Sequence, residues 1–330
     1  MRRAPAFLLL IITMAVHADD QKFASLGDFP LENGETIRDC RIGYRTAGVL
    51  NADRSNVLVV LTWFGGNSAG LAPSIGPGKL FDTDRWFVVT IDALGDGVSS
   101  SPSNSATQPG ARFPKFTMRD MVRTQHALLT RELKLSQVHG VAGLSMGGMQ
   151  ALQWPFSYPQ YMKKVVSITG TPRQMSHDLI LWKTQLELLE SFSGSPAHLR
   201  EVMEALAGIN MLELWTPSWM AKNVKASEVD ERMATHRASL ADRNAFDYMS
   251  QLRAMIGHDV GPLEEAAKTL RAELLMIVAL QDEMVNPGPS RELARVTGAR
   301  IATLSSDCGH LAPGCEPEVV AREVARFLAP

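Results

Sequence analysis

Short runs of β-branched and other apolar residues recur along this chain, and each is followed by glycine or polar residues. The runs occupy residues 55–64, 85–95, 137–145, 162–170, 272–280 and 299–306. Because they are nearly continuously apolar rather than alternating, they indicate strands buried on both faces, as in a parallel sheet. Amphipathic helical patterns separate them, for example at 116–133, with Thr117 as N-cap, and at 319–329. This alternation predicts an α/β fold with helices on both faces of a mostly parallel sheet.

Residues 173–262 interrupt the alternation, because they contain long helical patterns such as LILWKTQLELLESF and no clear strand. An insertion that follows a strand in an α/β fold usually covers the C-terminal edge of the sheet, where ligands bind. The sequence therefore predicts one domain, residues 19–330, with a core of residues 19–172 and 263–330 and a helical lid over residues 173–262. The alternative is a helical subdomain that takes no part in binding.

The N-terminus has the layout of a secretory signal peptide. Two arginines follow Met1, an apolar run comes next, and Val16 and Ala18 place small residues at a cleavage site. Residues 1–18 are therefore predicted to be removed on export, which makes the mature protein periplasmic or secreted. A short anchor and a buried N-terminal helix are the alternatives. No later segment is apolar enough to cross a bilayer, so we expect no stable membrane insertion.

Net charge, histidine spacing and cysteine content indicate which partners, metals and disulfides to expect. The formal net charge of −2 argues against nucleic acid or an anionic membrane surface as a partner. The histidines and cysteines lack metal-ligand spacing, so we expect neither a metal nor a cofactor. The three cysteines are Cys40, Cys308 and Cys315. Two alternatives are open: a bridge between Cys308 and Cys315, which would restrict His310 between them, or three buried unpaired cysteines.

The stretch VAGLSMGGMQALQW places Ser145 between the end of a predicted strand and a helix that we expect to stop near Pro155. The pattern Gly-x-Ser-x-Gly in this context indicates a nucleophile elbow, in which a sharp turn lifts the serine oxygen clear of the sheet. Gly147 and Gly148 leave room where such a turn packs against its neighbours. The sequence therefore predicts Ser145 as a nucleophile.

An acyl-transferring serine also needs backbone amides that stabilise an oxyanion. The helix N-terminus after the serine presents its amides to developing negative charge, so Met146 is the expected first donor. The second donor normally comes from the loop after an earlier strand. In this chain that loop is LTWFGGNSAG, which makes Trp63 the expected residue and Phe64 the next choice.

A nucleophilic serine needs a base and a carboxylate that orients the base. Hydrolases with a nucleophile elbow carry them in the order Ser, Asp or Glu, His. Asp282 follows the predicted strand at 272–280, and His310 follows the one at 299–306. Both lie just beyond strand ends, where a parallel sheet gathers its functional groups. Ser145, Asp282 and His310 are therefore the predicted triad, with Glu283 as the rival carboxylate and helix capping as the alternative role of Asp282.

Several stretches resemble the homoserine O-acetyltransferase branch of the α/β-hydrolase superfamily. They are GPGKLFDTDRWFVV, FTMRDMVRTQHALL, GLSMGGMQALQW, GYRTAGVLN at 43–51 and NAFDYMSQLRAMIGHDV at 244–260. The likeness covers most of residues 35–327 and is weakest in the lid. It implies the α/β-hydrolase fold and a homodimer. It also implies Ser145 as the acyl-accepting nucleophile, Asp282 as the orienting carboxylate and His310 as the base.

The sequence also departs from that branch. Leu311 follows His310 where the acetyltransferases carry an aspartate that helps to hold the substrate amine. The loop TWFGGNSAG differs from their threonine-glycine turn, and no lid arginine can be matched to the one that grips a homoserine carboxylate. An exported enzyme would not meet cytoplasmic acetyl-CoA, so water becomes the abundant acceptor of an acyl-serine.

These features together predict an exported serine hydrolase that cleaves a small carboxylic ester or a related acyl compound. The first alternative is an O-acyltransferase that moves an acyl group from a thioester to a hydroxyl acceptor. The second is a binding protein on a former hydrolase scaffold, which the ordered elbow and triad candidates argue against.

Overall fold

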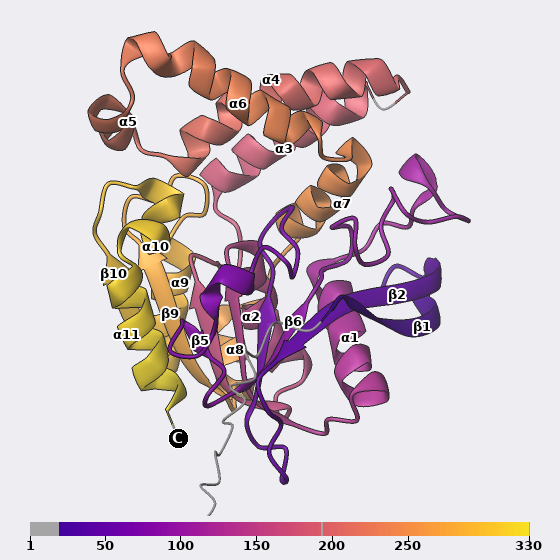
Figure 1. Cartoon of the computed structure of the whole chain (residues 1–330), viewed down its shortest axis with the longest axis vertical. Coiled ribbons are helices and arrows are strands. Elements are labelled where there is room, and N and C mark those ends of the chain that lie inside the picture. The colour runs from indigo at the N-terminus through magenta and orange to yellow at the C-terminus, as the bar shows by residue number, and fades with distance from the viewer. Residues whose placement is uncertain (1–19, 193, 330) are drawn as a thin grey trace, which may run out of the picture.

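The computed structural model describes residues 20–192 and 194–329, and an eight-stranded sheet in the order β1-β2-β6-β3-β7-β8-β9-β10 forms its centre (Figure 1). The strands from β6 to β10 along this order are parallel, whereas β1 pairs with β2, and β2 with β6, antiparallel. The bounds are Lys22–Pro30 (β1), Thr36–Ala47 (β2), Val57–Leu61 (β3), Phe87–Ile91 (β6), Val138–Leu144 (β7), Met162–Ile168 (β8), Glu273–Ala279 (β9) and Arg300–Leu304 (β10). The predicted signal peptide, residues 1–18, lies outside the described residues.

Each apolar run found in the sequence contains one of the parallel strands, so the predicted mostly parallel sheet is confirmed. The search for such runs does not detect the antiparallel pair β1 and β2 at the edge of the sheet. Strand β1 is half exposed, and its register with β2 shifts on both sides of Gly27, which has a φ of 65°. These bulges break the two-residue alternation that would otherwise reveal a strand.

Both faces of the sheet are covered, as the continuous apolar runs require. In β3, Val57, Val59 and Leu61 pack on one side, and Leu58 and Val60 pack on the other. Helices α1, α2, α8 and α9 contribute to the first core, and α11 packs in the second. Their bounds are Met118–Ala127 (α1), Met146–Ser157 (α2), Leu263–Thr269 (α8), Gly288–Thr297 (α9) and Pro317–Leu328 (α11).

The helix boundaries follow the local sequence. Thr117 caps α1 in a reciprocal capping box with Asp120, as the sequence predicts, and a π-helical turn, η3 (Leu128–Glu132), prolongs the helix. Helix α2 continues slightly beyond the predicted stop, because Pro155 is accommodated inside it and the helix ends at Ser157.

A layer of helices lies over one end of the sheet, at the top of Figure 1. The chain leaves the core after β8 and returns beside its own exit, where the amide of Val260 donates to the carbonyl of Pro172 at 3.0 Å. Helices α4 and α6 pack against each other, as do α3 and α7. The bounds are Ser176–Ser191 (α3), Pro196–Leu214 (α4), Pro217–Asn223 (α5), Val229–Ala241 (α6) and Ala245–Ile256 (α7). Within the described residues, none of the helices is long and apolar enough to span a bilayer.

Candidate active site

Ser145 lies on a strained turn between β7 and α2. Its φ of 55° and ψ of −118° are unfavourable for a residue with a side chain, and its amide is held by the carbonyl of Ile168 at 2.8 Å. Glycine is required two residues before the serine, at Gly143, and two residues after it, at Gly147. A Cβ on Gly143 would lie 2.0 Å from the carbonyl oxygen of Gly147, and one on Gly147 would lie 2.3 Å from that of Leu61. The Gly-x-Ser-x-Gly pattern is therefore the one that lets β7, α2 and β3 meet closely while the serine is held at the turn.

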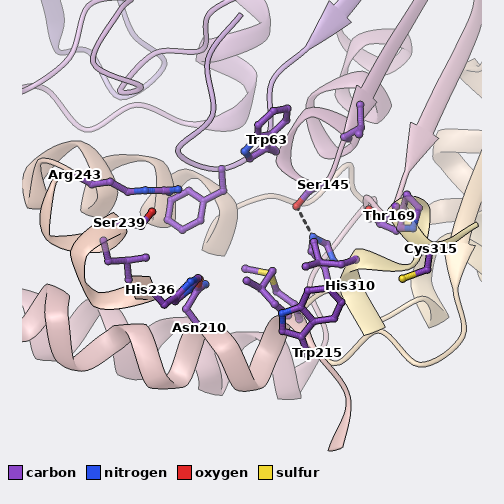
Figure 2. Close-up of a pocket in the computed structure, with 18 of the residues that line it drawn as sticks. Trp63, Ser145, Thr169, Asn210, Trp215, His236, Ser239, Arg243, His310 and Cys315 are labelled. Carbon is purple, nitrogen blue, oxygen red and sulfur yellow. Dashed lines mark hydrogen bonds between the residues drawn. The ribbon is translucent and has the colours of Figure 1, made fainter. Parts of the chain in front are cut away.

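The structure brings the side chain of His310 to this serine from a position 165 residues further along the chain. Its Nε2 lies 2.8 Å from Ser145 Oγ, as the dashed line in Figure 2 marks. His310 belongs to a short 3-10 turn, η5 (Gly309–Leu311), which follows β10. Both side chains are buried, so water competes little for their hydrogen bond.

Asp282 completes the arrangement behind the histidine. Its Oδ2 lies 2.7 Å from His310 Nδ1, and its Oδ1 accepts the backbone amides of Met284 at 3.0 Å and Val285 at 2.8 Å. An ionised carboxylate can only accept, so Nδ1 carries the proton and Nε2 is free to accept one from the serine. The rival carboxylate, Glu283, is exposed and makes no such contact.

Two opposing effects set the proton affinity of His310. Burial lowers its pKa, but the charge of Asp282 and the hydrogen bond to it, together with the charge of Glu213, outweigh burial and raise the pKa above its ordinary value. An imidazolium at this position is therefore favoured. The neutral ring, which can accept a proton, predominates once the pH exceeds this raised pKa.

The predicted oxyanion donors lie at the same place. Met146 is the first residue of α2, so its amide precedes the helical hydrogen bonds. Trp63 and Phe64 both line the cavity beside Ser145, and Figure 2 shows Ser145 between Trp63 and His310. The loop is fixed from behind: Gly65 has a φ of 66°, and its amide donates to Gln251 Oε1 at 2.9 Å. The loop that carries Trp63 and Phe64 is therefore held to the lid helix α7.

A cavity of about 560 Å³ opens at Ser145, between the core and the lid. Apolar side chains dominate the cavity wall around Ser145. Several polar side chains of the lid, among them Asn210, His236 and Arg243, lie on the opposite side of the cavity (Figure 2). The lid contributes Asn210, Leu214, Trp215, His236, Ser239, Leu240, Arg243 and Tyr248. A cavity of this size and character suits a small organic molecule.

Arg243 contributes a guanidinium group to the cavity wall. Burial lowers its pKa, and Figure 2 shows its side chain directed toward the cavity. Among the described residues, no carboxylate lies within ion-pair distance of it. A partly desolvated cation without a counter-ion offers hydrogen bonds to an acceptor group on a bound molecule.

The segment that carries His310 is fastened at several points. A disulfide joins Cys308 to Cys315 on either side of it, whereas Cys40 is a free and buried thiol whose pKa burial raises to about 12. Of the two cysteine alternatives, the structure therefore contains the bridged one. Thr216, after the end of α4, donates from its hydroxyl to the carbonyl of Asp307 at 2.5 Å. The bridge closes the loop that carries His310, and the bond from Thr216 ties the residue before this loop to the lid.

The residues that sequence reasoning missed all belong to the lid. Asn210, Glu213 and Tyr248 come from lid helices and Arg243 from the turn between α6 and α7, and no local pattern reveals how these segments are arranged in space. The one available signal was Glu213, a charged residue within the apolar stretch INMLELW. No group of His, Cys, Asp and Glu side chains that could hold a metal ion occurs among the residues that the structure describes.

A serine on a tight turn after a central parallel strand, below a helical lid, is the arrangement of the α/β hydrolases. The chain belongs to the α/β-hydrolase fold family, whose sequence model matches residues 56–314, and to its homoserine O-acetyltransferase-like branch. It is thus an esterase-like enzyme of a family that includes hydrolases and acyltransferases.

Relatives of both kinds are similar to the chain. The homoserine O-acetyltransferase of Thermobifida fusca is 38% identical over 88% of this chain and 89% of that enzyme. The ethyl acetate hydrolase of Pseudomonas veronii is 32% identical over 58% of this chain, but the match spans only 56% of that hydrolase. The structure of an acetylester hydrolase from Corynebacterium glutamicum superposes with a TM-score of 0.87 at 22% identity, over 93% of this chain and 95% of that one. This last likeness is one of fold, and it confirms the fold class expected from the sequence.

Proposed function

We propose that this protein is an exported serine esterase that cleaves a small carboxylic ester through an acyl-serine intermediate. The observation that carries the proposal is the unbroken relay from Ser145 Oγ to His310 Nε2, at 2.8 Å, and from His310 Nδ1 to Asp282, at 2.7 Å. These distances lie within the range that proton transfer to a general base requires.

In the proposed mechanism, Ser145 Oγ attacks the ester carbonyl while His310 Nε2 takes its proton. Asp282 holds the imidazolium, and the amides of Met146 and Trp63 stabilise the tetrahedral oxyanion, a contribution of about two to three orders of magnitude in rate per donor. The imidazolium then gives its proton to the leaving alcohol, which leaves an acyl group on Ser145. His310 next takes a proton from water, whose oxygen attacks the acyl carbon. The bond from the acyl carbon to Ser145 Oγ then breaks, His310 returns the proton to Oγ, and the acid is released.

Water is the proposed acceptor because a carboxylate associated with acceptor binding in the related acetyltransferases has no counterpart beside His310. Leu311 stands where the related acetyltransferases carry an aspartate, so the cavity offers no carboxylate there for a substrate amine. Acyl transfer to an alcohol is the second candidate, and the extensive similarity to a homoserine O-acetyltransferase supports it. Partitioning of the acyl-enzyme between water and an added alcohol separates the two candidates.

The cavity also limits the substrate. Its volume admits an ester of moderate size, and Arg243 favours one whose acyl or alcohol part carries an acceptor such as a carboxylate or a second carbonyl. We therefore expect Arg243→Met to lower kcat/KM about tenfold or more for esters that carry a carboxylate, and to change little for p-nitrophenyl acetate. An equal loss on both substrates would argue against this role.

The experiment that tests the proposal measures p-nitrophenyl acetate hydrolysis and fluorophosphonate labelling of the purified mature chain. We expect Ser145→Ala to abolish both. Ser239→Ala is the matched control, because Ser239 lines the same cavity and lies outside the relay. Wild-type activity in the Ser145→Ala variant would remove the serine from the mechanism. Formation of a new ester of the added alcohol at the expense of free acid, across a panel of alcohols, would instead favour the acyltransferase.

Export to the periplasm or beyond is part of the proposal. The charged, apolar and small residues at positions 1–18 support it, and so does the disulfide, because disulfides persist in oxidising compartments. Mass spectrometry of the protein from a periplasmic fraction should give an N-terminus at residue 19. Recovery of the uncleaved chain in the cytosol alone would contradict export. The homodimer implied by the family resemblance is likewise proposed, and sedimentation of the purified chain tests it.

A further inference from the structure

Glu213, near the end of lid helix α4, is a buried carboxyl that the proposed mechanism does not use. Its side chain is 4% exposed. Oε1 accepts from Asn210 Nδ2 at 2.6 Å, and Oε2 accepts from Gln185 Nε2 at 3.0 Å. Both partners are neutral amides. Gln185 is in turn held by the hydroxyl of Tyr248 at 2.8 Å, and Asn210 Oδ1 by His236 Nε2 at 2.9 Å. The carboxyl is therefore tied to helices α3, α4, α6 and α7 at once.

Within the described part of the chain, no arginine, lysine or histidine lies within ion-pair distance of the Glu213 carboxyl. Burial raises its pKa to about 7, against the lowering effect of the hydrogen bonds from Asn210 and Gln185 and of the nearby His310. Burial of the ionised carboxylate without a cationic partner is costly, so the charged form of Glu213 is stabilised when a positive charge forms close by.

The lid places this carboxyl next to the turn that carries the base. The end of α4 packs directly on η5, and a Cβ on Gly309 would lie 2.9 Å from the carbonyl oxygen of Leu214. The charge of Glu213 raises the pKa of His310, and a protonated His310 lowers that of Glu213. The two groups are therefore electrostatically coupled across the boundary between lid and core.

We propose that Glu213 is a positioning residue for the reaction, whose charge, held on the lid, stabilises the imidazolium that His310 becomes when Ser145 loses its proton. The inference rests on the proposed serine mechanism and adds a second carboxylate to it. Asp282 orients the ring from the core, through a direct hydrogen bond. Glu213 acts through space from the lid and touches neither the substrate nor the serine. The base is therefore fully effective only when the lid helices hold this carboxyl in place.

The other charged and titratable groups around Glu213 define what a test must control. They are His310 and Asp282 from the core, His236 from α6, Tyr248 from α7, and Arg243 between these two helices. Asp282 and His310 are the groups whose charges act on the Glu213 carboxyl. A substitution that removes only the charge at position 213 leaves all of the others in place.

The test is the pH dependence of fluorophosphonate labelling in the wild type and in Glu213→Gln. Labelling needs neutral His310, so its rate rises with pH through the pKa of that group. Without the negative charge the imidazolium is less stable, and the midpoint should move to lower pH by roughly half a unit. The weaker base should also lower the plateau rate by about two-fold, which is less than the roughly three-fold change in rate that half a pH unit represents. The two profiles therefore cross, whereas general damage to the fold would lower the rate equally at every pH.

Glu204→Gln is the matched control, because Glu204 is an exposed carboxyl on the same helix whose partner is Arg200. We expect its profile to match the wild type, and Glu213→Asp, which keeps the charge, to restore the wild-type midpoint. Coincident midpoints for Glu213→Gln and the wild type would overturn the inference and leave the serine mechanism intact. Failure of the wild type to label at any pH would overturn both.

A second variant covers the case in which Glu213→Gln does not fold. Gln185→Met removes one donor from the carboxyl, which raises the pKa of Glu213 and neutralises it at a higher pH. The midpoint of labelling should then move in the same direction as in Glu213→Gln. An unchanged midpoint in a folded Gln185→Met protein would also contradict the inference.

Discussion

Replacing Asp282 by asparagine should disable the base without disturbing the shape of the site. Oδ1 of this residue accepts two backbone amides, from Met284 and Val285. In the variant the amide oxygen must take this place, because turning the amide group would leave buried donors facing one another at a cost of about 1–3 kcal/mol each. The amide nitrogen then faces His310 Nδ1, which must accept rather than donate. The ring proton moves to Nε2, where it points at Ser145 and blocks proton transfer.

The expected loss in kcat is about 10³- to 10⁴-fold, which corresponds to about 4–5.5 kcal/mol of transition-state stabilisation. The assay is p-nitrophenyl acetate hydrolysis under saturating conditions, with circular dichroism as a check on folding. Glu283→Gln is the matched control, because Glu283 is adjacent in the chain, exposed and outside the relay. A folded Asp282→Asn enzyme that kept more than a tenth of the wild-type kcat would refute the assigned role of the carboxylate.

The remaining predictions concern the pH profile, the disulfide and the elbow. Because His310 must be neutral to act and its pKa is raised, activity should fall as the pH is lowered, with the midpoint of the acid limb above the ordinary histidine value of about 6.5; a midpoint at or below that value would contradict the pKa shift. Cys308→Ser with Cys315→Ser opens a loop that spans 7 positions and should cost about 2–3 kcal/mol in urea unfolding, a difference that a reductant should abolish. Gly147→Ala would place a methyl group 2.3 Å from a carbonyl oxygen of β3 and should cost at least ~3 kcal/mol or prevent folding. Gly208→Ala, in a helix with room for the methyl group, should be neutral or stabilising, and equal effects of the two glycine variants would exclude the steric explanation.

The core of the fold could be predicted from the sequence because its determinants are local. Continuous apolar runs fix buried strands, and the capping box at Thr117 starts α1 where the sequence places it. The elbow is equally local, since Gly143 and Gly147 each exclude a side chain that would strike neighbouring backbone. The edge strands β1 and β2 escape this reasoning because a bulge at Gly27 breaks their periodicity.

The residues of the candidate site likewise fall into those that the sequence indicates and those that only the structure reveals. The order of Ser145, Asp282 and His310 along the chain, each after a strand, made them candidates, because the ends of parallel strands meet at one edge of a sheet. The sequence alone could not select the bridged cysteines over free ones, or choose which lid side chains face the cavity. Arg243 has no local signal, and the charge of Glu213 within an apolar stretch does not reveal that the residue lies close to His310.

The sequence by itself thus determined the parallel strands of the sheet, the strained serine and the candidates for its base, because backbone sterics and apolar periodicity act over a few residues. Only the tertiary structure decided what acts on that base. The pKa of His310 is set by its burial, which lowers it, and by the charges of Asp282 at its ring and Glu213 on the lid, which raise it. Electrostatic effects of this kind depend on distance through the folded interior, which separation along the chain does not reveal.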